Sequence, residues 1–581
     1  MTTQPLDLPA GTRVSDAIIG VLEEAGVRFV VGIPGGHTGP LFSSLFEHPT
    51  IRTVLVREES IGTTMAEAFG RLTGQPIAVI GQGEWMVGNA GQGLLEAHLG
   101  ASPVIVLTDM TDAGPLAHHG PYQDGSANYG SWDARSAFSA VCKRVMVSDY
   151  PEQAVQHVQL ALKHAVTGEP GPVAVIFRRD ALAERLDPQR SPRLYPTSRY
   201  LPQRAQAVDQ AALDAAAQVL RAAQRPVVIA GNGVRLAGAG EAVRALAAQL
   251  DAPIVTTSSG KGVVDETAPT SGGVIGAFGW ASANALVGDS DVVVVVGSKL
   301  GPADTGDEHP GLLDPSRQTL IHIDVEPLNV AWTFPIDHPL VGDAASLVPA
   351  LTAAIGEMIP HPRTAERRVA DAQANDPRRT PEQPAASTSP FLPHDVIARL
   401  RAAIADDAIV TADAGENRLF MMHWFATGPG GDYLQPAAGG GMGYALPAAL
   451  AAKLAYPERT VVAVCGDGGF GMSMHSLMTA VQEDLPIVVV VLNNQALGWV
   501  AHGLGRRAIA SHFADFDHAS IARAIGCDAF TVVDEHSLDQ AFAAIDAAVR
   551  PTVIDVPLSM AVSFKDLLSD FSSHERQRSG Y

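Results

Sequence analysis

The sequence contains few cysteines and no long apolar run. Its three cysteines, Cys142, Cys465 and Cys527, are too far apart for a disulfide framework or a structural zinc site. The most apolar runs, 291–297 and 485–494, are much shorter than the roughly 18 to 20 residues of a membrane-spanning helix. The first residues also lack the basic and apolar regions of a secretory signal. We therefore expect a reduced, cytoplasmic protein without a membrane segment.

Basic residues are also scarce in this chain. The 40 Lys and Arg residues face 62 Asp and Glu residues, which gives a formal net charge of −22. Nucleic-acid binding depends on clustered Lys and Arg, so no nucleic-acid partner is expected. Charged residues are 18% and hydrophobic residues 46% of the sequence, which is typical of a folded globular chain rather than a disordered one.

The length of 581 residues exceeds what one hydrophobic core serves, since single cores stop growing at roughly 250 to 300 residues. Helical stretches alternate with short Val- and Ile-rich runs, and this pattern predicts the α/β class with doubly wound parallel sheets. Proline-rich stretches at 187–204 and 375–390 are predicted linkers. The expected parts are three such domains, 1–186, 205–358 and 388–560, and a tail or lid, 561–581.

Thirteen runs in these domains are typical of buried strands. They are RFVVG, TVLVR, PIAVI, SPVIVLTD and GPVAVIF in the first domain, RPVVIA, APIVTTSS, DVVVVV and TLIHID in the second, and AIVTAD, RTVVAVC, LPIVVVVLNN and RPTVIDVP in the third.

Two polar signals follow neighbouring strands of the third domain. Asp467 stands in a Gly-Asp-Gly-Gly run after one strand, and the pair Asn493-Asn494 ends the next strand, with the 24 residues 469–492 between Gly468 and Asn493. A helix and a strand fill this spacing, so both signals are expected at the same edge of the sheet. Aspartate and asparagine oxygens suit Mg²⁺, and the glycines let backbone N–H groups approach a diphosphate. A Gly-Asp-Gly alone is compatible with an ordinary turn, but the two signals together favour a metal–diphosphate site.

This pair of motifs resembles that of thiamine diphosphate enzymes. Nearly the whole chain is similar to the superfamily of acetolactate synthase, oxalyl-CoA decarboxylase and 2-hydroxyacyl-CoA lyase, whose PYR, central and PP domains follow the same order. The resemblance implies that Asp467, Asn494 and the backbone carbonyl of Ala496 bind Mg²⁺. It also implies a cofactor-binding set of Gly415, Glu416, Asn417, Gly440, Met442, Gly466, Asp467, Gly468, Gly469, Asn494, Ala496 and Leu497.

Two further segments carry the resemblance. TVLVREESIGTTMAEAFG resembles the family segment whose glutamate protonates the aminopyrimidine ring of the cofactor, and Glu59 matches that glutamate. AAGGGMGYALP resembles the glycine-rich segment in which a bulky residue, here Met442, wedges beneath the cofactor, while the backbone of Gly440 and Met442 would bind the pyrimidine. Taken alone, Glu58-Glu59 is compatible with a solvated helix start, and Met442 with core packing.

Four residues are candidates for facing the substrate. His37 follows the first strand in a glycine-rich loop and is a candidate proton donor, although a loop histidine bound to solvent or backbone is an equal alternative. Gln82 falls where benzoylformate decarboxylase has a catalytic histidine, and Gln123 resembles a glutamine that acetolactate synthases place near the cofactor. Gln495 follows the asparagine pair.

The leading functional hypothesis is a carbon–carbon lyase that forms an acyl-anion intermediate from a 2-hydroxyacyl-CoA or related acyl-CoA. The sequence NNQALGW after the strand departs from acetolactate synthases, so an acetolactate-synthase-like 2-oxo acid decarboxylase or carboligase is the alternative. A catalytically silent cofactor-binding homologue is a second alternative.

The resemblance also bears on partners. It implies a homodimer at minimum, commonly a homotetramer, and FAD, ADP, coenzyme A or no ligand in the central domain. A CoA thioester substrate would need basic residues such as Arg235, Lys261, Arg576 and Arg578. The tail would then form a lid over the substrate, whereas the alternative for it is a disordered end.

Overall fold

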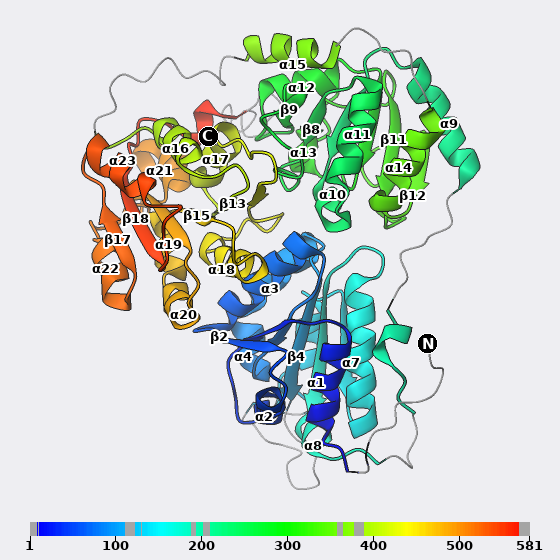
Figure 1. The fold of residues 1–581 in the computed structure, drawn as a ribbon, viewed down its shortest axis with the longest axis vertical. Helices are drawn as coiled ribbons and strands as arrows, with labels where there is room; N and C mark the ends of the chain where they lie inside the picture. Colours follow the sequence, from blue (N-terminus) through cyan, green and yellow to red (C-terminus); the bar gives the residue numbers. More distant parts are fainter. Residues whose placement is uncertain are drawn as a thin grey trace. The chain divides into compact units, whose positions relative to one another are not determined.

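The computed structural model describes residue 9 and residues 11–110, 123–128, 130–187, 193–201, 209–356, 364–376 and 389–568. The chain divides into two compact units, 1–203 and 204–581. The first unit contains one six-stranded parallel sheet and the second contains two, each flanked by helices, so the predicted α/β class with three doubly wound sheets is confirmed (Figure 1). Within the described ranges, no helix has both the length and the apolar character needed to cross a bilayer.

The sheet of the first unit has the strand order β2-β1-β3-β4-β6-β5, and all its pairs are parallel. Every residue of β4 is buried, as expected for a strand covered by helices on both faces. The strands are β1 (Phe29–Gly32), β2 (Arg52–Leu55), β3 (Ala78–Ile80), β4 (Val104–Met110), β5 (Arg144–Ser148) and β6 (Pro172–Arg178). The helices are α1 (Val14–Glu24), α2 (Gly39–Glu47), α3 (Glu59–Thr73), α4 (Gly83–Gly88), α5 (Gly91–Leu99), α6 (Ala134–Ser139), α7 (Pro151–Val166), α8 (Arg179–Ala183) and the 3₁₀ turn η1 (Thr197–Arg199).

The second sheet has the order β12-β11-β10-β7-β8-β9. Its five-valine strand β10 is completely buried, with apolar clusters on both of its faces. The strands are β7 (Val227–Ala230), β8 (Ile254–Thr256), β9 (Ser271–Val274), β10 (Val292–Val296), β11 (Thr319–Asp324) and β12 (His338–Val341). The helices are α9 (Gln210–Ala222), α10 (Asn232–Ala237), α11 (Gly240–Leu250), α12 (Ala281–Gly288), α13 (Pro302–Thr305), α14 (Ala344–Ile355) and α15 (Thr364–Ala374).

The third sheet has the order β14-β13-β15-β16-β18-β17, which repeats the order of the first sheet when its strands are counted from its own start. The strands are β13 (Ile409–Ala412), β14 (Asp432–Leu434), β15 (Val461–Gly466), β16 (Val488–Asn493), β17 (Asp528–Thr531) and β18 (Thr552–Pro557). The helices are α16 (Pro393–Ala403), α17 (Glu416–Trp424), α18 (Ala445–Ala455), α19 (Asp467–Ser473), α20 (Ser476–Gln482), α21 (Gly498–Leu504), α22 (His518–Ile525), α23 (Glu535–Ala543) and the 3₁₀ turns η2 (Gly505–Arg507) and η3 (Phe564–Asp566).

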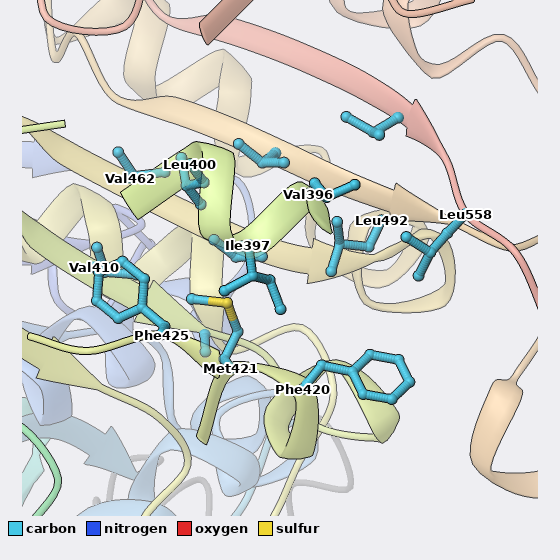
Figure 2. Close-up of a cluster of buried hydrophobic side chains, with 14 of the residues drawn as sticks. Val396, Ile397, Leu400, Val410, Phe420, Met421, Phe425, Val462, Leu492 and Leu558 are labelled. Atoms are coloured by element: carbon cyan, nitrogen blue, oxygen red, sulfur yellow. The ribbon is translucent and has the colours of Figure 1, made fainter. Parts of the chain in front are cut away.

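One face of the third sheet packs against α16 and α17. Figure 2 shows this cluster of buried apolar side chains, in which the two helices meet the strands and the residue that follows β18. Burying such side chains stabilises the fold by about 1.5 to 3 kcal/mol each. The labelled residues are Val396, Ile397, Leu400, Val410, Phe420, Met421, Phe425, Val462, Leu492 and Leu558.

Part of one predicted linker is packed rather than extended. In 193–201, the Thr197 amide donates a 2.8 Å hydrogen bond to Glu24, and Gln159 donates a 2.7 Å hydrogen bond to the Tyr195 carbonyl. The rest of 188–208 and most of 375–390 lie outside the described residues.

In each sheet the chain first adds strands toward one edge and then returns to add strands toward the other edge, which makes a switch point. These switch points lie between β1 and β3, between β7 and β10, and between β13 and β15. In open parallel sheets, ligands bind at the carboxyl ends of the strands beside a switch point. At the second sheet, the loops there pack on each other, because a Cβ on Gly231 would stand 2.2 Å from the Gly297 carbonyl oxygen. Close packing therefore explains why glycine stands at this position, and a ligand of the central domain stays a prediction.

Candidate functional site

Asp467 and Asn494 lie at the ends of the neighbouring strands β15 and β16. The strands are parallel, with Gly466 opposite Leu492, so both residues emerge at the same edge of the third sheet. Asp467 is buried, with 6% of its surface exposed. Its Oδ2 and the Oδ1 of Asn494 each accept a 3.1 Å hydrogen bond from the Ala496 amide. The crossover therefore brings the two side chains together, as their spacing predicts.

Ala496 is held between these side chains and a neighbouring loop. It pairs with His512 in an isolated antiparallel bridge, whose 2.8 Å hydrogen bonds use the Leu497 amide and the Gln495 carbonyl. In such a pair the amide and carbonyl of the central residue point away from the partner strand. The Ala496 carbonyl therefore lies on the side of Asp467, and its role as a metal ligand stays a prediction.

The oxygen atoms at this edge fit a hard divalent cation. Burial raises the pKa of the Asp467 carboxyl to about 6, although hydrogen bonds from backbone amides and the nearby His518 lower it. A nearby cation favours the charged form of such a group. One carboxylate, one amide oxygen and one carbonyl suit Mg²⁺, which keeps waters and phosphate oxygens as its other ligands. Across the described ranges, no three His, Cys, Asp or Glu residues are grouped to hold a metal by themselves.

Asp413, a buried carboxylate that the sequence analysis did not single out, organises the glycine-rich loop 439–443. It follows β13 and is 1% exposed. Its carboxylate accepts hydrogen bonds from the amides of Ala414, Gly443 and Ala445 at 2.7, 2.9 and 3.2 Å. Burial raises the pKa of Asp413 to about 6, although these amides lower it. The loop is thus fixed to the end of β13.

Met442 lies over the Gly-Asp-Gly turn. A Cβ on Gly468 would stand 2.9 Å from the Met442 Cε and 3.0 Å from the Leu497 Cδ2, and Gly469 is equally confined. Gly440, with φ of 69°, stands near the start of the same loop. The predicted contacts Gly440, Met442, Gly468, Gly469 and Leu497 therefore form one group around the edge of the third sheet. Met442 is half-buried, so one side of its chain remains open.

The predicted diphosphate loop begins at Gly415, whose φ is 79° and which precedes α17. Glu416 is 5% exposed, and its Oε1 accepts a 2.9 Å hydrogen bond from the Phe564 amide and lies 2.7 Å from the His502 Nδ1. Asn417 donates to two backbone carbonyls. Both side chains are turned into the protein, so a diphosphate would meet this loop through backbone N–H groups.

The chain after β18 packs on this loop. The ring of Phe564 stacks on Trp499 with 4.1 Å between centroids, and the His502 Nε2 lies 3.0 Å from the Met560 carbonyl oxygen. The start of the predicted tail or lid is therefore part of the folded third domain. Residues 569–581, with the two arginines considered for coenzyme A, lie outside the described residues.

Glu59 is the first residue of α3, at the carboxyl edge of the first sheet. It is 7% exposed, and its Oε2 accepts a 3.0 Å hydrogen bond from the Asn89 side chain. Its Cγ lies 3.6 Å from the position of a Cβ on Gly81, in the turn after β3. The alternative of a solvated helix start is wrong, because this carboxyl group is buried and bound by a side chain.

The substrate-facing candidates divide between the two units. In the first unit, the His37 Nδ1 lies 2.7 Å from the Asp109 Oδ2, and Gln82 donates a 2.6 Å hydrogen bond to Gln123. In the second unit, Gln495 is exposed and donates a 3.1 Å hydrogen bond to Asp515. The structure thus brings Gln82 and Gln123 together, while the Gln495 side chain is bound at the surface.

Comparison with known proteins identifies the family. Residues 12–128, 213–351 and 413–556 match the N-terminal TPP-binding, central and C-terminal TPP-binding domains of thiamine pyrophosphate enzymes. A probable 2-ketoarginine decarboxylase of Pseudomonas aeruginosa is 30% identical over 541 residues, which cover 90% of each chain. The chain belongs to the thiamine diphosphate-dependent enzymes.

Other members of the family are similar over most of their length. A probable acetolactate synthase large subunit of Methanocaldococcus jannaschii is 27% identical, over 94% of this chain and 92% of its own. An acetolactate synthase large subunit of Corynebacterium glutamicum is 29% identical, over 93% of this chain and 86% of its own. These relatives support the acetolactate-synthase-like alternative better than the leading acyl-CoA hypothesis.

The residues of this thiamine diphosphate-dependent enzyme that the sequence analysis missed are carboxyl groups with distant partners. Asp413 binds backbone amides of a loop about 30 residues away, and Asp109 binds His37 from a different strand end. Their only sequence signal is an acidic residue at or just after a buried strand, as in AIVTAD and SPVIVLTD. Asp467 also follows a buried strand, so a search of the sequence for acidic residues at strand ends would find Asp109, Asp413 and Asp467.

Proposed function

We propose that the chain is a thiamine diphosphate- and Mg²⁺-dependent enzyme that breaks or forms carbon–carbon bonds of 2-oxo acids, as an acetolactate-synthase-like decarboxylase or carboligase. The observation that carries the proposal is the convergence of Asp467 and Asn494 oxygens at the switch point edge of the third sheet. The choice of 2-oxo acids rests on the relatives, whose names describe acetolactate synthesis and 2-ketoarginine decarboxylation.

In this proposal the third sheet holds the metal and the diphosphate. Asp467, Asn494 and the Ala496 carbonyl bind Mg²⁺, since all three oxygens are on the same side of the Ala496 bridge. Backbone N–H groups of 415–417 and 466–469 bind diphosphate oxygens, because glycines let the backbone approach them closely.

The organic part of the cofactor is assigned by the same reasoning. Met442 supports the rings with its open side, the backbone of Gly440 and Met442 binds the pyrimidine, and Leu497 adds apolar contact. Glu59 exchanges a proton with the pyrimidine, held in place by Asn89. Thiamine diphosphate supplies an electron sink for cleavage beside a carbonyl, while the protein supplies orientation and protons.

A 2-hydroxyacyl-CoA lyase or oxalyl-CoA decarboxylase has less support. None of the relatives named above is called a coenzyme A enzyme. Two basic residues considered for CoA are engaged elsewhere. The Arg235 guanidinium donates to backbone carbonyls, including the Tyr433 carbonyl at 2.9 Å. The buried Lys261 ammonium donates to Glu266 at 2.6 Å and to the Phe425 carbonyl at 2.7 Å.

A direct assay tests the proposal. The purified chain is incubated with thiamine diphosphate and Mg²⁺, and pyruvate, 2-ketoarginine, oxalyl-CoA and a 2-hydroxyacyl-CoA are added in separate reactions followed by mass spectrometry. We expect a 2-oxo acid to lose CO₂ and give an aldehyde or a ligated product, while both thioesters remain intact. Thioester cleavage alone would favour the acyl-CoA lyase, and cofactor binding without any turnover would favour the silent homologue.

Two variants make the assay specific. Asp467→Ala removes the proposed metal ligand and should lose both Mg²⁺ binding and turnover. Asp528→Ala removes a carboxylate of the same domain whose side chain is 53% exposed and pairs only loosely with Arg550, at 3.5 Å. This second variant should keep full activity, since it lies on the edge strand β17.

A further inference from the structure

The turn Gly81-Gln82-Gly83, between β3 and α4, connects Glu59 to a second pair of titratable side chains. A Cβ on Gly81 would stand 3.6 Å from the Glu59 Cγ, and the Gly83 amide donates a 3.2 Å hydrogen bond to the Asp109 Oδ1. A Cβ on Gly83 would stand 2.4 Å from the Asp109 carbonyl oxygen, so the turn fits tightly on β4. Asp109 and Glu59 therefore border the same turn at one edge of the first sheet.

Asp109 forms a close pair with His37. The His37 Nδ1 lies 2.7 Å from the Asp109 Oδ2, and the two side chains are 17% and 2% exposed. An ionised carboxylate only accepts hydrogen bonds, so Nδ1 carries the shared proton. The Nε2 atom has no hydrogen-bond partner among the residues that the structure describes. This leaves Nε2 as the ring nitrogen available to a ligand.

The surroundings of the pair are acidic and polar. Among the described residues, Asp109, on β4, and Glu84, on α4, are titratable groups that interact electrostatically with His37. The Glu84 Oε1 is buried without a hydrogen-bond partner in the described part of the chain, and burial and the nearby Asp109 raise the pKa of Glu84. Gln82 and Gln123 border the same cluster, since Gln123 binds both Gln82 and Glu84.

We propose that Asp109 is a positioning residue that holds His37 with Nε2 toward the substrate, and that His37 exchanges a proton with substrate oxygen. The proposal rests on the proposed function and names its acid–base group. As a new carbon–carbon bond forms, an electron pair of the acceptor carbonyl moves to its oxygen, which takes the Nε2 proton of the His37 imidazolium. The imidazole regains that proton from the hydroxyl group that becomes the product ketone, so His37 is restored by the ligation, while the one proton that replaces the lost CO₂ is taken up from solvent.

A second histidine–carboxylate pair of the first unit provides a matched control. The His48 Nδ1 lies 2.8 Å from the Glu23 Oε2, and both side chains are 27% exposed. This pair joins the chain after α2 to α1 and makes no contact with the Gly81-Gln82-Gly83 turn in the described hydrogen bonds. Glu23→Gln therefore removes a comparable charge without touching the proposed site.

The first test measures His37 directly and needs no activity. Diethyl pyrocarbonate modifies an imidazole nitrogen that is not engaged by a partner, so the labelling rate of the His37 peptide, followed by mass spectrometry, reports how the ring is held. We expect Asp109→Asn to change the labelling rate of His37, because the ring loses the carboxylate that binds its Nδ1. Glu23→Gln should change the labelling rate of His48 and leave that of His37 unchanged. An unchanged labelling rate of His37 in Asp109→Asn would overturn the pairing.

The second test follows turnover with a 2-oxo acid, thiamine diphosphate and Mg²⁺. Asp109→Asn and His37→Gln should each lower kcat by about 10²-fold with cofactor affinity unchanged, and the double variant should lose little more, because both act in one step. In Asp109→Asn the loss should fall on kcat and leave the KM for the 2-oxo acid nearly unchanged. Retention of wild-type kcat in either variant would refute the role.

Two features keep this result interpretable. If Asp109→Asn does not fold, His37→Gln, at a partly exposed position, tests the same pair alone. If the wild-type chain converts none of the 2-oxo acids, the proposed function fails and the catalytic role with it. The change in labelling rate would then still report the pairing of Asp109 and His37, so the two failures differ.

Discussion

At the scale of single residues, buried carboxyl groups border both candidate sheet edges. Asp413 and Asp467 have a pKa raised to about 6 by burial, and burial also raises the pKa of Asp109 and Glu416. Each is placed by backbone amides or a histidine rather than by Lys or Arg. Such groups cost stability when charged, so their presence at strand ends indicates binding or positioning roles rather than structural ion pairs.

Glu59→Gln tests the acid assigned to the pyrimidine. The glutamine keeps the size of the side chain and can still bind Asn89, but it cannot exchange a proton. We expect unchanged cofactor affinity by calorimetry and a loss of turnover of about 10²-fold or more. Glu58→Gln, at the preceding N-cap position, is the matched control and should keep activity. Full activity of Glu59→Gln would remove this residue from the mechanism.

Asp413→Asn tests the buried carboxyl group through the pH dependence of stability. The folded-state pKa of Asp413 is about 6, above the ordinary value of 3.8, so its contribution to stability is present below pH 4 and is lost as the pH rises through 6. This change amounts to roughly 2 to 3 kcal/mol. The stability of the wild type relative to the variant should therefore be greater at pH 4.5 than at pH 7.5 in urea unfolding. A pH-independent difference would contradict the burial argument.

At the scale of elements, the strands with continuous apolar runs were predictable and most edge strands were not. The thirteen predicted runs correspond to β1–β4, β6–β8, β10, β11, β13, β15, β16 and β18, while β5, β9, β12, β14 and β17 were missed. All five missed strands lie at an edge of their sheet, although the edge strand β2 was predicted. The missed strands lack the continuous apolar run of a central strand, because β5, β12 and β17 are partly exposed, β9 contains two glycines and β14 has only three residues.

The candidate site, too, was predictable only where its residues follow strands with a clear sequence pattern. Asp467 and Asn494 follow central strands at a fixed spacing, so their meeting could be inferred from the chain alone. Contacts made across loops, such as that of Gln495 with Asp515, depend on tertiary packing and carry no periodic signal. The packing of the chain after β18 onto α17 and α21 is of the same kind.

Truncation tests this C-terminal element. Removing residues 560–581 takes away Phe564, which is 4% exposed and stacks on Trp499, and the amide that binds Glu416. Loss of a buried Phe side chain costs about 3 to 5 kcal/mol, so the melting temperature should fall by several degrees and diphosphate affinity with it. Removing only 569–581 is the control and should change neither. If the shorter truncation instead alters the KM for substrate, the tail acts as a lid.

At the scale of the whole molecule, each unit carries only part of the predicted cofactor set. Glu59 lies in the first unit, and Asp467, Asn494 and Met442 lie in the second. The resemblance to thiamine diphosphate enzymes implies a homodimer at minimum, commonly a homotetramer, and this assembly stays a prediction.

Dilution tests the assembly. If the cofactor lies between chains, specific activity should fall in parallel with the fraction of dimer, measured by light scattering and analytical ultracentrifugation, because each site would then need residues of two chains. Excess thiamine diphosphate and Mg²⁺ should oppose the loss, since ligands that bind only the assembled form stabilise it. A monomer with full specific activity would contradict this expectation.

The matching strand order of the first and third sheets places a similar turn at the same point of each sheet. In both sheets the third strand leads into a Gly-X-Gly turn and a short helix, Gly81-Gln82-Gly83 before α4 and Gly466-Asp467-Gly468 at the start of α19. The two sheets therefore present equivalent turns that differ in the chemistry of the middle residue, a neutral amide in one and a carboxylate in the other.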